Sequence, residues 1–168
     1  MRNIEIKARL REIEHVRQYM RQKGTHHEIQ HQRDVFFHCS HGRLKLRCFP
    51  DGTGVVVAYE RPDQSGPKLS DYTLAHAQDA GNMENALTRA LGMRGVVEKT
   101  REIALIGQTR IHLDTVKDLG NFLELEVVMR RGQDEQEGLA IANDLMKDLH
   151  IAEADLLDKA YMDMLEKR

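Results

Sequence analysis

Residues 122–128 read Phe122-Leu-Glu-Leu-Glu-Val-Val128, and acidic and aliphatic residues alternate through this stretch with a period of two. Successive side chains of a β-strand point to opposite faces of the sheet, so Glu124 and Glu126 would share one face while Leu123, Leu125 and Val127 share the other. The opening stretch, Asn3-Ile-Glu-Ile-Lys-Ala-Arg9, alternates in the same way. Both stretches are therefore predicted to be strands with one apolar face and one ionic face.

Three further segments place ionisable residues of both signs two positions apart: Arg43, Lys45 and Arg47; Lys99 and Arg101; and Arg110, His112 and Asp114. For any one strand, a solvated polar face explains the pattern well. Over five strands, however, a solvated face should mix Ser, Thr, Asn and Gln among the charges. The ionic excess instead favours a barrel whose apolar side chains pack outward against helices and whose charges line the lumen. A lumen so rich in Lys and Arg predicts a polyanionic ligand.

Apolar periodicity and turn residues divide the chain into eight strands and four helices, with no internal repeat. The predicted strands cover residues 3–10, 27–38, 43–49, 55–61, 68–74, 96–106, 109–116 and 122–129. The predicted helices cover residues 12–23, 82–91, 134–149 and 156–165. We therefore expect an α+β fold, an eight-stranded antiparallel barrel with flanking helices, formed by residues 1–168 as a single domain.

Composition narrows the functional classes. The chain has 25 basic and 27 acidic residues and a net charge of −2, which argues neither for nor against nucleic acid. It has no Trp and only four Phe and four Tyr to stack on bases, so no DNA partner is expected. Neither a long apolar run nor an export signal is evident, which predicts a cytoplasmic protein without a membrane span. The two cysteines, Cys39 and Cys48, are predicted to be reduced thiols.

Six short motifs occur in order along the chain: Asn3-Ile-Glu-Ile-Lys7, Gly42-Arg-Leu-Lys-Leu-Arg47, Glu98-Lys-Thr-Arg101, Arg110-Ile-His-Leu-Asp114, Leu119-Gly-Asn-Phe-Leu-Glu-Leu-Glu126 and Ala160-Tyr-Met-Asp-Met-Leu165. The ordered set resembles the CYTH superfamily, also called triphosphate tunnel metalloenzymes. That group includes class IV adenylyl cyclases, thiamine triphosphatases and RNA triphosphatases. The resemblance spans nearly the whole chain, and it implies an eight-stranded antiparallel barrel that forms a tunnel with a charged lumen.

The resemblance also implies roles for individual residues. Basic residues would hold the triphosphate oxygens: Lys7, Lys45, Arg47, Lys99, Arg101 and Arg110, with Lys7, Arg47 and Arg110 as the catalytic ones. Acidic residues would hold Mg²⁺ or Mn²⁺: Glu5, Asp114, Glu124 and Glu126. The chemistry suits these residue types, because Arg and Lys neutralise phosphate charge while carboxylate oxygens bind hard cations that bridge to phosphate.

Two positions depart from the family pattern. The first strand usually reads E-x-E-x-K, and Asn3 stands where the first Glu is expected. An amide oxygen can still ligate a metal, but it adds no charge. The family also commonly has Lys two residues before a Pro after the fourth strand, where this chain has Glu60. We expect Arg61 or Lys68 to make that phosphate contact instead.

The resemblance leaves the reaction open. A metal-dependent triphosphatase acting on tripolyphosphate, thiamine triphosphate or ATP is the favoured interpretation, with class IV adenylyl cyclase as the close alternative. A cyclase needs a nucleoside pocket, for which the stacking candidates are Phe36, Phe37, Tyr59 and Tyr72, although core packing also explains them. A noncatalytic polyphosphate or nucleotide binder and a lipid-carrying barrel are further hypotheses. The rim of the barrel leaves room for a homodimer.

Overall fold

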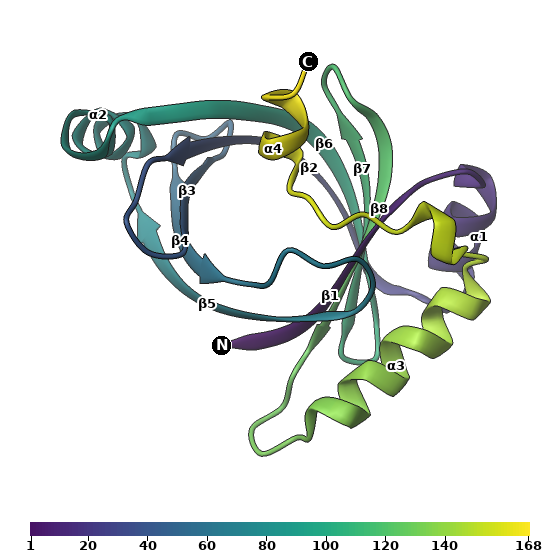
Figure 1. Ribbon diagram of the computed structural model, residues 1–168. Coiled ribbons are helices and arrows are strands. Elements are labelled where there is room, and N and C mark those ends of the chain that lie inside the picture. The colour runs from purple at the N-terminus through teal and green to yellow at the C-terminus, as the bar shows by residue number, and fades with distance from the viewer.

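The computed structural model describes all 168 residues. Its eight antiparallel strands close into a barrel in the spatial order β1-β5-β4-β3-β2-β6-β7-β8, and β8 pairs with β1 to complete the ring (Figure 1). The strands are β1 (Arg2–Arg9), β2 (Thr25–Phe37), β3 (Arg43–Cys48), β4 (Gly54–Glu60), β5 (Lys68–Ala77), β6 (Met93–Ile106), β7 (Thr109–Val116) and β8 (Gly120–Val128). The predicted eight-stranded antiparallel barrel is confirmed.

The largest apolar core lies outside the barrel, between the strands and two helices, α1 (Ile13–Lys23) and α3 (Glu135–Asp148). Alternate residues of β1 and β8, such as Ile4, Ile6, Leu123 and Leu125, point outward into this core and are less than 2% exposed. Since the side chains between them therefore point inward, the ionic faces line the lumen. This outward core is the arrangement that the alternation in the sequence predicts.

Two other helices contact the barrel elsewhere. Helix α2 (Ala80–Leu91) covers β3, where a second core forms around Leu46 and Phe37. The short helix α4 (Tyr161–Leu165) lies at the rim of the ring in Figure 1, and its Tyr161 and Met162 join an apolar cluster that includes Phe36 of β2 and Phe122 of β8. None of the four helices combines the length and the apolar character needed to cross a membrane.

The last predicted helix, over residues 156–165, is wrong in its first half. A 3₁₀ turn (Glu153–Asp155) leads into an extended segment, in which Leu156 forms a β-bridge with Ala8. The Leu157 backbone N–H then donates a 2.9 Å hydrogen bond to the Lys7 carbonyl. Leu156 and Leu157 contact two different apolar clusters, as neighbours in extended chain do, so their apolar character does not mark a helical stripe.

Candidate functional site

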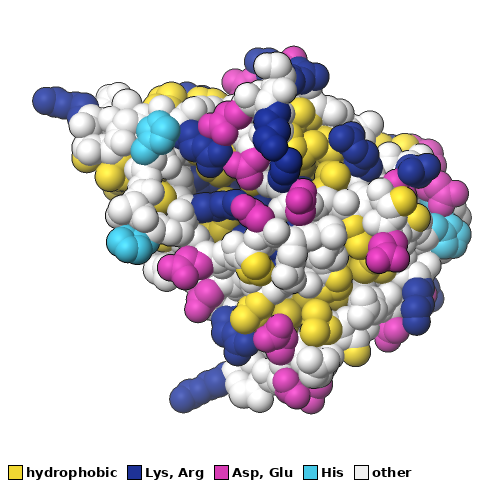
Figure 2. All heavy atoms as spheres, in the orientation of Figure 1, with side chains coloured by type: hydrophobic (Ala, Val, Ile, Leu, Met, Phe, Trp, Pro, Cys, Tyr) yellow, Lys and Arg dark blue, Asp and Glu magenta, His cyan; other side chains and the backbone are white.

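The inward faces of the strands enclose a cavity of about 460 Å³. Figure 2 shows Lys and Arg side chains gathered in and around the hollow, with acidic side chains among them. Seven basic side chains line the cavity: Lys7, Lys45, Arg47, Arg61, Lys99, Arg101 and Arg110. Five acidic side chains line it as well: Glu5, Glu28, Asp34, Glu124 and Glu126. Of the predicted site residues, Lys68 and Asp114 do not contribute to this lining.

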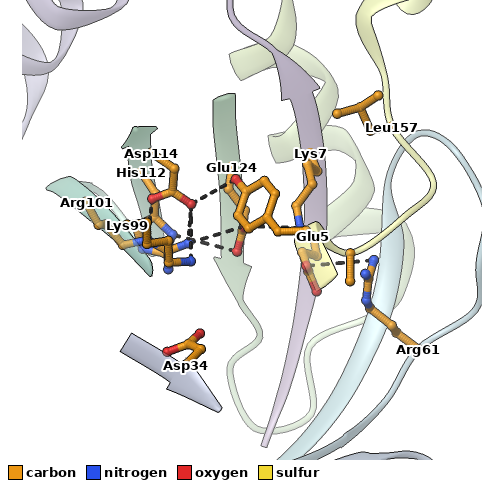
Figure 3. A network of polar contacts seen from close by, with 12 residues as sticks. Glu5, Lys7, Asp34, Arg61, Lys99, Arg101, His112, Asp114, Glu124 and Leu157 are labelled. Atoms are coloured by element: carbon orange, nitrogen blue, oxygen red, sulfur yellow. Dashed lines mark hydrogen bonds and ion pairs between the residues drawn. The ribbon is translucent and has the colours of Figure 1, made fainter. Parts of the chain in front are cut away.

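Asp114 lies at the centre of a buried ionic cluster (Figure 3). Arg101 donates two hydrogen bonds of 2.6 Å to its two carboxylate oxygens, and Lys99 donates one of 3.3 Å. These contacts follow from the pairing of β6 with β7, which places Arg101 directly opposite Asp114. Burial alone would raise the pKa of Asp114, but Arg101 and Lys99 outweigh it and lower that pKa. Burial, with Arg101 nearby, lowers the pKa of Lys99 to about 7.

Glu124 and Glu126 project into the lumen from β8, between strands that supply cations from both sides. Lys7 Nζ lies 3.5 Å from a Glu124 oxygen, and an Arg101 nitrogen lies 3.4 Å from the same atom. Arg110 contacts Glu126 at 2.8 Å. The register explains the grouping, because Lys7 pairs with Glu124 across β1 and β8, and Arg110 pairs with Glu126 across β7 and β8. Both glutamates are therefore held by cations.

Glu5, Arg61 and Lys68 form a third group near the start of β5. A nitrogen of Arg61 lies 4.0 Å from a Glu5 oxygen, and the Arg61 side chain is 2% exposed. Burial, followed by the charge of Glu124, raises the pKa of Glu5. Lys68 Nζ donates a 2.8 Å hydrogen bond to the Gln64 carbonyl, outside the cavity lining, and burial lowers its pKa to about 8. Arg61 therefore reaches the lumen, whereas Lys68 supports the adjacent loop.

Asp34 on β2 was not predicted as a site residue, yet it anchors two of the predicted phosphate ligands. Arg47 donates two hydrogen bonds of 2.8 Å to its carboxylate, and Lys45 donates one of 2.9 Å. Burial alone would raise the pKa of Asp34, but Arg47 and Lys45 hold it well below the usual range. The sequence contained one indication of this role. Gln30, Gln32 and Asp34 alternate along the strand and share its inward face, but only Asp34 of the three is ionic, so the face does not stand out as a charged one.

The carboxylates of Glu124 and Glu126 lie close to a third candidate metal ligand, the imidazole of His112. Ligand atoms of His112, Glu124 and Glu126 all lie within 4.8 Å of one another, whereas Glu5 and Asp114 are not members of this group. Burial, followed by the charge of Arg101, lowers the pKa of His112. On β1, the Asn3 side-chain oxygen is buried without a hydrogen-bond partner. Oxygen donors of this kind fit Mg²⁺ or Mn²⁺.

Tyr161 of α4 joins the ionic cluster from the end of the tunnel, a contact that the sequence did not predict. Its hydroxyl donates a 2.9 Å hydrogen bond to Asp114, and Lys7 Nζ lies 4.0 Å from the centre of its ring. The ring thus offers a cation–π contact to Lys7, and the hydroxyl satisfies an Asp114 oxygen. Of the four aromatic residues predicted as stacking candidates, Phe36, Tyr59 and Tyr72 line the cavity, while Phe37 packs in the core beneath α2.

Replacing Tyr161 with Phe should lower the free energy of unfolding by about 1.5–3 kcal/mol, because the variant removes a buried hydrogen bond to a charged group. Chemical denaturation followed by circular dichroism measures the change. Tyr19→Phe is the matched control, since the Tyr19 hydroxyl donates a 2.8 Å hydrogen bond to Asp148 at an exposed site. Equal losses in the two variants would show that the Asp114 contact adds nothing specific.

Comparisons with known proteins agree with this architecture. The structure resembles that of the PH1012 protein of Pyrococcus horikoshii, with 25% identity, a TM-score of 0.84, and coverage of 96% of this chain and 98% of the other. An adenylate cyclase candidate from Vibrio parahaemolyticus has 19% identity, a TM-score of 0.76, and coverage of 98% and 97%.

A third solved structure is HpAC1 from Hippeastrum, for which a dominant triphosphatase activity is described. It has 13% identity, a TM-score of 0.67, and coverage of 98% of this chain and 95% of the other. At such identities, the Vibrio and Hippeastrum structures support the fold alone. No curated protein matches the chain.

The family comparison covers almost the whole sequence. The family model described as the CYTH domain matches residues 1–161, which include all eight strands, the residues that line the cavity, and the first residue of α4. The motifs that suggested the resemblance fall on β1, β3, β6, β7 and β8 and on the start of α4. The chain therefore belongs to the CYTH domain family.

Proposed function

We propose that the protein is a metal-dependent triphosphatase that binds a triphosphate in its tunnel and releases the terminal phosphate. The observation that carries the proposal is the convergence of seven basic side chains, from four strands and the loop after β4, on one cavity. Such a set suits a compact polyanion, because preorganised cations stabilise the charge that shifts during phosphoryl transfer. The triphosphatase activity described for the Hippeastrum relative is consistent with this assignment.

The ion pairs indicate how a triphosphate would bind. Without ligand, Lys7, Arg101 and Arg110 contact the carboxylates of Glu124 and Glu126. In this proposal, phosphate oxygens take over part of these contacts, so the cations turn to the ligand while the glutamates become available to a metal. Lys45, Arg47, Arg61 and Lys99 provide further phosphate contacts, and Lys7, Arg47 and Arg110 stabilise the charge of the reacting phosphoryl group.

Mg²⁺ or Mn²⁺ would be held by Glu124 and Glu126, with Glu5 as a further oxygen donor. When bound, such an ion neutralises phosphate charge and lowers the pKa of a coordinated water. The ligand role predicted for Asp114 would require its contacts with Arg101, Lys99 and Tyr161 to break. In our proposal Asp114 instead positions Lys99 and Arg101. Lys68, which contacts backbone carbonyls, supports the loop that carries Arg61.

Class IV adenylyl cyclase activity is the second candidate function, because aromatic and apolar side chains also line the cavity. Tyr59, Tyr72 and Phe49 line the same cavity as the basic residues, together with Leu74 and Ile103. Apolar and aromatic side chains beside a phosphate site can accept a nucleoside base. The same surface also suits the organic part of thiamine triphosphate, so the reaction products must decide between the two activities.

Phosphorus NMR of the reaction products tests the proposal. The protein is incubated with Mg²⁺ or Mn²⁺ and, separately, with tripolyphosphate, thiamine triphosphate and ATP. We expect orthophosphate release from at least one substrate, and we expect Glu126→Gln to lower the rate at least ~10²-fold because a metal ligand is lost. Glu98→Gln is the matched control, since Glu98 lies on the outer face of β6 and pairs with Lys117.

Other product patterns would contradict the triphosphatase assignment. Cyclic AMP with pyrophosphate would establish the cyclase instead. Ligand binding without turnover would establish a noncatalytic polyphosphate or nucleotide binder. Unchanged orthophosphate release in Glu126→Gln would mean that the carboxylate does not take part in the reaction.

A further inference from the structure

One buried nitrogen beside the two glutamates has no hydrogen-bond partner. His112 on β7 is 3% exposed, and its Nδ1 lies 3.9 Å from a Glu124 oxygen, which is too long for a hydrogen bond. Nδ1 forms no hydrogen bond with any other group in the protein. Because buried polar atoms are nearly always paired, an unpaired imidazole nitrogen in an ionic lumen requires an explanation.

The backbone places this nitrogen beside the candidate metal ligands. His112 pairs with Glu124 across β7 and β8, and Arg110 pairs with Glu126 two residues away, so all four side chains point into the lumen. Figure 3 shows His112 and Glu124 projecting from neighbouring strands into the same region of the tunnel. Ligand atoms of His112, Glu124 and Glu126 lie within 4.8 Å of one another. Small rotamer adjustments would bring three such atoms to one metal ion.

We propose that His112 is a metal ligand and that the site it forms with Glu124 and Glu126 prefers Mn²⁺, Co²⁺ or Zn²⁺ to Mg²⁺. The inference rests on the proposed metal-dependent function and deepens it. Imidazole is a good ligand for first-row transition metals, whereas Mg²⁺ strongly prefers oxygen donors and retains its waters. One nitrogen donor in an otherwise carboxylate site therefore shifts selectivity away from Mg²⁺.

The cations around the glutamates make metal binding dependent on the ligand. Glu126 accepts a 2.8 Å contact from Arg110, while Lys7 and Arg101 approach Glu124 at 3.5 and 3.4 Å. A metal must compete with these positive charges, and a bound triphosphate would draw them toward its own oxygens. Metal binding should therefore be tighter in the presence of tripolyphosphate. His112 does not share this competition, because its Nδ1 has no hydrogen-bond partner in the protein.

Pulsed EPR of Mn²⁺ bound to the full chain, with and without tripolyphosphate, tests the assignment directly. We expect the spectrum to show nitrogen coupling from a bound imidazole and to change when the protein carries ¹⁵N-histidine. In His112→Gln the coupling should vanish, Mn²⁺ should bind at least ~10-fold more weakly, and the ratio of Co²⁺ to Mg²⁺ affinity should fall at least ~10-fold.

His26→Gln is the matched control. His26 also lines the cavity, and its Nε2 lies 4.0 Å from a Glu28 oxygen, so it is the competing source of a nitrogen signal. Retention of the coupling in His26→Gln, with loss in His112→Gln, supports the proposal. When His112→Gln does not fold, the isotope-labelled His26→Gln variant keeps the test decisive, because it removes the other histidine of the cavity lining.

Failure of this inference differs from failure of the proposed function. The role of His112 is overturned when Mn²⁺ binds without nitrogen coupling and this binding is lost in Glu124→Gln or Glu126→Gln. That result leaves a carboxylate metal site in place. An absence of Mn²⁺ binding under all conditions overturns both. A nitrogen signal that disappears only in His26→Gln places the metal at the mouth of the tunnel and also overturns the assignment.

Discussion

Arg101→Gln should unfold with a free energy about 3–5 kcal/mol lower than that of the wild-type protein, which is the usual cost of removing one partner from a buried ion pair. The Arg101 side chain is 4% exposed, and Asp114 is fully buried. Without the guanidinium, Asp114 loses two hydrogen bonds of 2.6 Å and retains only those from Lys99 and Tyr161. A buried carboxylate with so little compensation is strongly destabilising.

The double variant Arg101→Gln with Asp114→Asn separates the structural effect from ligand binding. Neutralising Asp114 should restore a large part of the lost stability, because the buried charge of Asp114 no longer remains without its guanidinium partner. Tripolyphosphate affinity, measured by calorimetry, should stay low in both variants, since neither has the guanidinium. Denaturant titrations give the stabilities. A double variant no more stable than Arg101→Gln would show that the two charges are not coupled.

Arg17→Gln provides the surface comparison for this experiment. Arg17 also makes a two-point contact with a carboxylate, Glu102, at 3.1 and 2.7 Å, but both side chains are 28% exposed. Solvent screens such a pair, so its loss should cost no more than about 1 kcal/mol. The contrast tests whether burial, rather than the two-point geometry, determines the cost at Arg101.

The barrel could be predicted from the sequence because its cause is local. In strands such as the one that carries Glu124 and Glu126, charged and aliphatic residues alternate, so each strand has one charged face and one aliphatic face. The hydrophobic effect then places the aliphatic face against helices. The final helix could not be predicted in the same way. Leu156 and Leu157 pack into two separate apolar clusters, so their apolar character does not reflect one face of a helix. Only the tertiary structure shows that this segment runs extended beside β1.

The site was harder to predict than the fold, because partner choice depends on strand register. The alternation of side chains along each strand predicts that Asp34 and Asp114 face inward, but it does not predict which cation each one contacts. The pairing of β2 with β3 sets Asp34 opposite Arg47, and that of β6 with β7 sets Arg101 opposite Asp114. The unpaired nitrogen of His112 likewise emerges only from the distances between side chains.

Asp34→Asn should destabilise the ligand-free protein by about 2–3 kcal/mol, somewhat less than the roughly 3–5 kcal/mol of a fully buried pair. Asp34 is 2% exposed, whereas its partners Lys45 and Arg47 are 16% and 18% exposed and remain partly screened by solvent. In the variant, the two cations repel each other without a carboxylate between them. Thermal unfolding at neutral pH measures the loss.

The pH dependence of that loss has a defined sign. The pKa of Asp34 is held well below its usual range, so its contribution is present above the unfolded-state pKa of about 3.9 and is lost as the pH falls further. The difference in stability between wild type and Asp34→Asn should therefore shrink as the pH falls below about 5. A difference that stays constant down to pH 2 would mean that the carboxylate charge is not its source.

Tripolyphosphate should reverse part of the effect of Asp34→Asn, and this links the ion pair to the proposed function. In the wild-type protein, phosphate must compete with Asp34 for Lys45 and Arg47, whereas in the variant both cations are free to bind it. The rise in melting temperature on adding tripolyphosphate should thus be larger for Asp34→Asn than for wild type. Glu84→Gln is the matched control, because Glu84 makes a two-point contact with Arg33 on the outer face of the same strand. Its response to tripolyphosphate should equal that of the wild type, and an equal response in Asp34→Asn would show that Lys45 and Arg47 do not bind the phosphate.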